Sequence, residues 1–317
     1  MAAFGLGTHV GAVDIRRTCP LCGTGELPQW RFGLRCCVGC GLKVSPAVWS
    51  ANANEKFEEE WFGKEYEVTQ SMWIRFFEQL NNKRTLRRLA THATGGHLLE
   101  IGVGSGSLLQ DARNAGFQVT GCDLSRPICE NVGRRLGVPI HCCAVSELPE
   151  LASFDVVVMN HVLEHVPDPV GLLQEVRKHL AAGGVLHVAV PNIACLSAAL
   201  PGWASYEPYH LTYFSSSTLR RALTTAGFII ERELTHESFS GWFLAGVRTV
   251  LRHGRCSAVA DNGRRMAERA LRRSAYVEHA YRLCMVISGV LSWPLRRMQG
   301  ILGRGDELIC IARVACG

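Results

Sequence analysis

The middle of the chain alternates between short apolar runs and segments with helical periodicity. Six runs have the length and the Val/Ile/Leu content of strands, at 97–103, 117–123, 138–145, 154–160, 184–192 and 228–234. Between them, apolar residues recur at helical spacing, which predicts helices at 107–114, 126–136, 170–181 and 215–226. Apolar strands that alternate with helices predict a parallel sheet covered on both faces, which is an α/β fold.

The segments before and after this core lack the alternation, and we expect four further units there. Residues 1–50 are rich in Gly, Cys and Pro and predict a small separate unit, and residues 51–95 predict a helical linker. The core then covers 96–239. Residues 240–303 predict a helical insertion, and 304–317 predict a last strand that returns to the core sheet.

Composition narrows the class of protein without identifying it. The 317 residues are 47% hydrophobic and 20% charged, as in ordinary soluble proteins, and the net charge of +6 is too small to indicate nucleic acid by itself. We find no run long enough to span a membrane and no signal peptide. The fourteen cysteines then predict reduced thiols or metal ligands and a cytoplasmic location.

The first strand–helix turn carries the strongest candidate site. It contains Glu100, Gly102, Gly104 and Gly106, where glycines allow a ligand to approach the backbone. The third glycine comes one position earlier than in the dinucleotide fingerprint G-x-G-x-x-G. A carboxylate at Glu100 could hold an ammonium group. Asp123, at the end of the second strand, could accept hydrogen bonds from two ribose hydroxyls.

These features resemble the class I S-adenosylmethionine (SAM)-dependent methyltransferases. The stretch "LLEIGVGSG" is similar to their first motif, E/D-x-G-x-G-x-G. Further segments resemble later motifs in the same order: "VTGCD", "FDVVVMNHVLEHVPDP" and "LAAGGVLHVAVPN". The segment "PYHLTYFSSSTLRRALTTAGF" resembles a bacterial subfamily that includes ubiquinone-type O-methyltransferases. The resemblance covers about residues 95–235 and the last strand.

The resemblance implies a doubly wound, seven-strand Rossmann-like methyltransferase sheet whose last strand is antiparallel and lies beside the sixth. It also implies SAM as the cofactor. Many relatives have an acid near the adenine after the third strand, where this chain has Ala144 and Val145, so contacts there would be apolar or from the backbone. The implied SAM-contacting residues are Glu100, Gly102, Gly104, Gly106, Asp123, Leu124, Val145, Asn160 and His161.

Methyl transfer needs a positioned acceptor and, for a hydroxyl acceptor, benefits from a general base. His210 lies on the acceptor side and is our first candidate for a base or an orienting group. His161 follows the fourth strand directly and is the second candidate, although it could instead line the SAM pocket. Glu164 and His165 are expected to be structural. Each histidine could also be an ordinary hydrogen-bonded loop residue.

Two C-x-x-C pairs near the start, Cys19/Cys22 and Cys37/Cys40, predict a tetrahedral zinc site with four thiolate ligands. Cys36 could replace Cys37, but the knuckle spacing favours Cys37. A redox pair is disfavoured because no strand–helix context surrounds either motif. The unit resembles zinc ribbons that precede several bacterial methyltransferases.

The insertion combines an arginine-rich stretch, 248–273, with thirteen uncharged residues, 283–295, followed by two arginines. It could form a core helix with a solvated arginine face, an interfacial contact of 283–297 with a membrane, or a lid over an apolar acceptor. An RNA-contacting surface is a further alternative, although nucleic acid is disfavoured because few aromatic residues interleave with the arginines.

Taken together, the sequence predicts a cytoplasmic SAM-dependent methyltransferase, with peripheral membrane contact left open. The expected acceptor is an oxygen of a small-molecule, saccharide or lipid-linked metabolite, with nitrogen and carbon also open. One alternative is an RNA-binding protein or RNA methyltransferase that uses the zinc ribbon and the arginines. Another is a protein that binds SAM without catalysis. The oligomeric state is not predicted.

Overall fold

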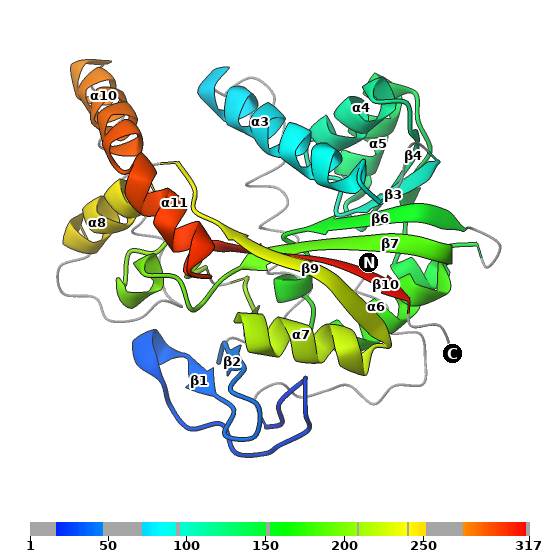
Figure 1. Ribbon diagram of the computed structural model, residues 1–317, viewed down its shortest axis with the longest axis horizontal. Coiled ribbons are helices and arrows are strands. Elements are labelled where there is room, and N and C mark those ends of the chain that lie inside the picture. Colours follow the sequence, from blue (N-terminus) through cyan, green and yellow to red (C-terminus); the bar gives the residue numbers. More distant parts are fainter. Residues whose placement is uncertain are drawn as a thin grey trace.

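A seven-stranded sheet forms the centre of the molecule (Figure 1). The computed structural model describes residues 17–46, 72–92, 96–149, 153–207, 209–239, 241–251 and 275–314. The strands of this sheet are β3 (His97–Ile101), β4 (Gln118–Asp123), β5 (Ile140–Cys142), β6 (Phe154–Asn160), β7 (Leu180–Pro191), β9 (Phe228–His236) and β10 (Glu307–Val314). The helices that cover it are α3 (Met72–Leu89), α4 (Ser107–Asn114), α5 (Arg126–Leu136), α6 (Pro169–Lys178) and α7 (Ser216–Thr225).

The strand order is β5-β4-β3-β6-β7-β10-β9. Strands β3 to β7 pair in parallel, whereas β10 lies between β7 and β9 and is antiparallel to both. This confirms the predicted doubly wound sheet and the predicted position of its last strand. The carboxyl ends of the parallel strands share one edge, which is where ligands of such sheets bind.

The central strands send alternate side chains into two cores, one on each face of the sheet. Leu98, Val156 and Val158 pack with apolar residues of α3, α4 and α5. Leu99 and Val157 pack on the opposite face with residues of α6 and α7. Figure 1 shows the two helical layers above and below the sheet.

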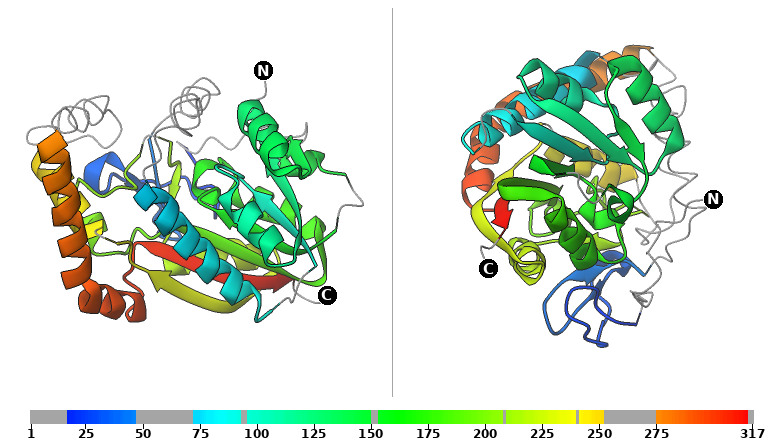
Figure 2. Two further views of the ribbon diagram at one scale, coloured as in Figure 1. Left: turned by 90° about the horizontal axis from the view of Figure 1, so that it is seen from above. Right: turned by 90° about the vertical axis from the view of Figure 1, so that its right-hand side faces the viewer.

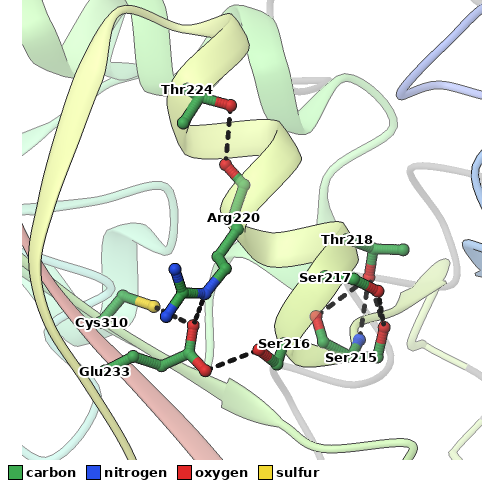
Figure 3. Close-up of polar contacts among 8 residues, drawn as sticks. All are labelled: Ser215, Ser216, Ser217, Thr218, Arg220, Thr224, Glu233 and Cys310. Atoms are coloured by element: carbon green, nitrogen blue, oxygen red, sulfur yellow. Dashed lines mark hydrogen bonds and ion pairs between the residues drawn. The ribbon is translucent and has the colours of Figure 1, made fainter.

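Helix α7 is fixed to the outermost strand by one ionic contact. Arg220 Nε lies 2.6 Å from Glu233 Oε2 on β9, and Ser216 Oγ donates to the other carboxylate oxygen at 2.6 Å (Figure 3). The helix starts with a capping box, in which the Ser215 backbone N–H donates to the Thr218 hydroxyl at 2.8 Å. These contacts orient α7 on the half of the sheet that contains β10.

The predicted helices at 107–114 and 126–136 are confirmed at both ends. The helix expected at 170–181 ends earlier, at Lys178, because the chain joins β7 at Leu180, which pairs with Phe154. The strand expected at 138–145 is reduced to three residues. It is an edge strand that hydrogen-bonds to only one neighbour, and a 3₁₀ turn begins at Val145.

The cysteine-rich unit is joined to the core by a second sheet. Strands β1 (Arg35–Cys36) and β2 (Lys43–Val44) pair antiparallel, and β2 pairs in turn with β8 (Thr212–Tyr213) of the core. The Ser45 N–H also donates to the Leu211 carbonyl at 2.8 Å. The unit therefore lies against the segment that precedes α7.

Between β9 and β10, the described residues form three helices: α8 (Gly241–Leu251), α10 (Ala275–Leu291) and α11 (Trp293–Ile301). They form one end of the molecule (Figure 2). Most of the arginine-rich stretch lies in 252–274, outside the described residues. Within the described part of the chain, no helix is both long and apolar enough to cross a bilayer.

Candidate functional site

The glycine turn after β3 has the geometry of a ligand-binding loop. Gly102, Gly104 and Gly106 have φ angles of 76°, 50° and 70°, in the left-handed region that favours glycine. A Cβ atom at Gly102 would lie 2.5 Å from Val162, and one at Gly106 would lie 2.5 Å from Val132. The turn therefore requires glycine for its backbone conformation and for its packing against the residues that follow β6 and against α5.

Asp123 anchors this turn from the end of β4. Its Oδ2 accepts from the Val103 N–H at 2.8 Å, and its Oδ1 accepts from the Ser125 N–H at 2.9 Å. Burial raises the pKa of Asp123, and the backbone donors oppose this effect. A carboxylate oxygen can accept more than one hydrogen bond, so Asp123 can accept from a ligand hydroxyl in addition to a backbone N–H.

Glu100 is buried at the carboxyl end of β3, with 5% of its surface exposed. Its Oε2 has no hydrogen-bond partner in the described structure. Burial raises the pKa of Glu100 well above its usual value, and the nearby Asp123 carboxylate adds to the shift. A cation placed here would relieve this unfavourable burial, so the residue suits a ligand ammonium group.

Two of the other predicted SAM-contacting residues lie at the same sheet edge. Leu124 directly follows β4, and Asn160 ends β6. Val145 is buried in the core, and its carbonyl lies 3.2 Å from Nε2 of His179.

A cavity of about 130 Å³ opens where β6 ends and β10 begins, beneath α3. It adjoins the glycine turn, because Val162, which packs on Gly102, follows Asn160 and His161 at the cavity wall. The cavity is lined by Asn81, Arg84, Thr85, Arg88, Asn160, His161, His187, Ala189, His236, Glu307 and Ile309.

His161 is held between two carboxylates at the cavity wall. Its Nδ1 lies 3.2 Å from Glu164 Oε1, and its Nε2 lies 3.3 Å from Glu307 Oε1. Burial alone would lower the pKa of His161, but these hydrogen bonds outweigh burial and raise it well above 6.5. Its φ of 56° is unusual for a residue other than glycine, and such conformations concentrate at functional sites.

His210 lies behind His161, in a buried cluster with Glu164 and His165. Its Nδ1 bonds to the Ser205 carbonyl at 2.8 Å, and its ring meets that of His165 edge-on with centroids 4.8 Å apart. Burial alone would raise the pKa of Glu164, but the hydrogen bond from His161 and the nearby histidines lower it to about 2. Among the described residues, His210 is not part of the cavity wall.

Sequence reasoning missed five ionisable residues of the cavity, because they belong to no motif and come from four distant elements. Two signals could have indicated some of them: a histidine within the apolar run of β7, and an acid at the start of the last strand. The missed residues are Arg84, Arg88, His187, His236 and Glu307.

The four predicted metal-binding cysteines converge in the N-terminal unit. The sulfur atoms of Cys19 and Cys40 lie 3.5 Å apart, and those of Cys22 and Cys37 lie 3.4 Å apart. All four lie within 4.8 Å of one another. Disulfide sulfurs would lie about 2.05 Å apart, whereas a tetrahedral zinc–thiolate site places its sulfurs about 3.8 Å apart. The Cys36 sulfur instead faces backbone carbonyls, so the four-cysteine set fits zinc without it.

The fold, the glycine turn and the ordered motifs agree with sequence comparison. The methyltransferase domain family matches residues 73–233, just over half of the chain. The chain therefore belongs to the methyltransferase domain family and is a class I SAM-dependent methyltransferase by fold and motifs.

Individual relatives match shorter stretches. A probable S-adenosylmethionine-dependent methyltransferase of Mycolicibacterium smegmatis is 33% identical over 47% of this chain and 58% of its own length. The ubiquinone biosynthesis O-methyltransferase of Idiomarina loihiensis is 34% identical over 31% of this chain and 43% of its own length. The chain thus spans about half the length of these two relatives.

A solved methyltransferase structure from Galdieria sulphuraria, whose name refers to sarcosine and dimethylglycine, shares the fold. It has a TM-score of 0.52 and 15% identity, over 83% of this chain and 97% of its own length.

Proposed function

We propose that the protein transfers the methyl group of SAM to an oxygen of a small-molecule, saccharide or lipid-linked metabolite. The observation that carries the proposal is the polar cavity beside the glycine turn, because it provides space for an acceptor next to a donor bound at β3 and β4. The similarity to ubiquinone biosynthesis O-methyltransferases supports oxygen as the acceptor atom.

In this proposal the turn and its two acids bind the donor. Glu100 holds the amino-acid end, Asp123 holds the ribose, and Leu124, Val145 and Asn160 complete the site. Bound SAM supplies a methyl group on a positive sulfonium, and the chain supplies positioning, which is worth about 7–11 kcal/mol of barrier in well-oriented reactions.

His161 is the proposed proton acceptor, because it lines the cavity whereas His210 lies behind it. Only neutral imidazole can accept a proton, and Glu164 and Glu307 favour the protonated form of His161. We therefore expect the rate to rise with pH through the raised pKa of this histidine. In this proposal His210 has a positioning role: through its contacts with His165 and with the Ser205 carbonyl it supports the buried cluster that contains Glu164.

Incubation with radiolabelled SAM and a cell extract tests the proposal directly. We expect label in a protein-dependent product after partition between organic solvent and water, and no such product with the Asp123→Ala variant. Label in RNA would favour the alternative RNA-methylating activity. No label in any fraction, together with binding of S-adenosylhomocysteine, would indicate a SAM-binding protein without catalysis.

We also propose that Cys19, Cys22, Cys37 and Cys40 bind one structural Zn²⁺. The separations of their sulfur atoms support this assignment. A segment of this length has few apolar residues to bury, so metal binding would supply much of its folding free energy.

We propose, finally, that residues 283–297 contact a membrane surface. Leu283, Val290, Leu291 and Trp293 are 60%, 61%, 76% and 56% exposed. Exposed apolar residues with a tryptophan and neighbouring arginines are typical of interfacial helices. Arg297 lies over the Trp293 ring, with 5.7 Å between its guanidinium carbon and the ring centroid.

A further inference from the structure

The cavity contains a buried histidine with no partner. His187 lies within β7, is 1% exposed and lines the cavity. Neither of its ring nitrogens has a hydrogen-bond partner among the described residues. Buried polar groups are nearly always hydrogen-bonded, so two unsatisfied nitrogens on a residue that lines a cavity point to a ligand.

Arg88 is a second cavity side chain without a hydrogen-bond partner among the described residues. It is half-buried on α3 and lines the same cavity, and within the described chain its guanidinium makes no hydrogen bond or ion pair. Burial lowers the pKa of Arg88, and the Glu307 carboxylate opposes this effect. Arg84, one turn earlier, differs because its Nη1 already contacts His236 Nε2 at 2.9 Å and Asn81 Oδ1 at 3.2 Å.

The charges around the cavity favour an anion. Arg84, Arg88 and the protonated His161 outnumber Glu307, which is the only carboxylate in the described lining. Glu307 is itself occupied by its hydrogen bond with His161. His187 is neutral at physiological pH because burial, aided by Arg88, lowers its pKa to about 4, so its ring offers one N–H donor and one acceptor.

We infer that the methyl acceptor carries an anionic group, a carboxylate or a phosphate, which binds between Arg88 and His187. Guanidinium and imidazole N–H groups are suitable donors for such anions. The second nitrogen of His187 can accept a hydrogen bond from a hydroxyl of the same molecule. The inference rests on the proposed function, since it specifies which acceptors the cavity would take.

One rival ligand is the carboxylate of SAM itself. A bound donor has a single carboxylate, at the amino-acid end that the glycine turn and Glu100 would hold. If Arg88 bound that group, removing the guanidinium would weaken binding of the donor. If Arg88 binds the acceptor, donor affinity stays the same. This difference separates the two assignments without any measurement of methyl transfer.

The experiment uses the full chain with zinc bound and measures binding by calorimetry, with and without S-adenosylhomocysteine. The probes are salicylate, inorganic phosphate and the uncharged salicylamide. The test variant is Arg88→Gln, and its matched control is Arg87→Gln, because Arg87 is an exposed neighbour on α3 outside the described cavity lining. His187→Asn provides a second, independent variant, and thermal melts check the folding of each protein.

We expect salicylate or phosphate to bind the wild-type protein and to bind at least tenfold more weakly to Arg88→Gln and His187→Asn. Arg87→Gln should bind the anion as the wild type does, and S-adenosylhomocysteine affinity should change less than twofold in Arg88→Gln. The inference is overturned if neither anion binds, if Arg88→Gln binds both unchanged, or if it loses donor affinity to the same degree. Failure of S-adenosylhomocysteine to bind would instead count against the proposed function. The two failures can be distinguished because anion binding is also measured without S-adenosylhomocysteine.

Discussion

At the scale of single residues, Asp123 joins the two parts of the proposed donor site. Its carboxylate accepts backbone N–H groups from the glycine turn and from the loop after β4. We expect Asp123→Ala to weaken S-adenosylhomocysteine binding at least tenfold, because the ribose loses its acceptor and the turn loses its anchor. Calorimetry measures the affinity.

Glu130→Ala, an exposed change on α5, is the control for Asp123→Ala and should leave the affinity unchanged. Unchanged affinity in a folded Asp123→Ala protein would refute the ribose assignment.

Because Glu307 contacts His161, we expect it to influence the pH dependence of catalysis. Burial alone would raise the pKa of Glu307, but the hydrogen bond from His161 lowers it to about 2, so the pair is ionised at neutral pH. In Glu307→Gln, His161 loses a negative partner and its pKa falls. The acid limb of the pH profile of kcat/KM, measured across pH 5–10, should therefore move to lower pH. A limb that does not move would exclude His161 as the proton acceptor.

Residues within continuous motifs could be predicted from sequence, and residues assembled from distant segments could not. Gly102, Gly104 and Gly106 were predicted and have the required left-handed conformation, because a turn is a local property. Arg88, His187 and Glu307 meet only when α3, β7 and β10 are packed together.

At the scale of elements, the ends of β9 and β10 bring two acids together under α11. Glu237 is 2% exposed, and its Oε2 accepts from Gln299 Nε2 at 3.4 Å. Burial, with repulsion from Asp306, raises the pKa of Glu237 to about 8. The fold therefore favours the protonated acid, and this stabilisation is lost as pH rises from about 4.5 through 8.

We expect Glu237→Gln, which resembles the protonated form, to be more stable than the wild type at pH 8–9 by at least about 1 kcal/mol, the equivalent of less than one pKa unit. The difference should shrink toward pH 5. Urea unfolding at both values measures it. A gap that does not depend on pH would show that Glu237 is ionised throughout.

The helical insertion carries the proposed lipid contact on α10 and α11. We expect the double variant Leu291→Ser/Trp293→Ser to reduce cosedimentation with phosphatidylglycerol vesicles severalfold, because it removes two large exposed apolar side chains near Arg297. Ile229→Ser on β9 is the matched control, since Ile229 is 57% exposed outside the insertion. Equal losses in both proteins, or no wild-type binding, would contradict the proposal.

Whether a segment forms a helix or a strand could be predicted, because the apolar residues of helices and strands recur with different periods. Where each element ends depended on strand pairing in the sheet. The helix before β7 ends at Lys178 because the next residues join the sheet, which local periodicity does not reveal. Whether the insertion covers the sheet was also undetermined by sequence. The exposed side chains of α10 show that much of its apolar surface is uncovered in the described structure.

At the scale of the whole molecule, the cysteine-rich unit and the core share a sheet through β2 and β8. We expect Cys37→Ser to lose bound zinc and to melt roughly 5 °C lower or more, since about 1 kcal/mol corresponds to roughly 2–4 °C in domains of about 150–250 residues. Amide exchange at Thr212 and Tyr213 should accelerate, because their pairing partners on β2 lose order.

Cys36→Ser is the matched control for the zinc prediction. The Cys36 sulfur faces the carbonyls of Cys37 and Gly41, so this variant should keep one zinc per chain by elemental analysis. A Cys37→Ser protein that retains its zinc would refute the ligand set.

The boundaries of the five units predicted from the sequence remain predictions.

The sheet register shows where the segment that contains α8, α10 and α11 leaves the sheet and where it returns. His236, at the end of β9, is paired directly with Glu307, at the start of β10. The chain thus leaves and re-enters the sheet at facing residues, as in a hairpin whose turn has been replaced by an excursion. Such an excursion can grow, shrink or be exchanged between relatives without altering the strand order, so evolution can vary the surroundings of the cavity while the donor-binding half stays constant.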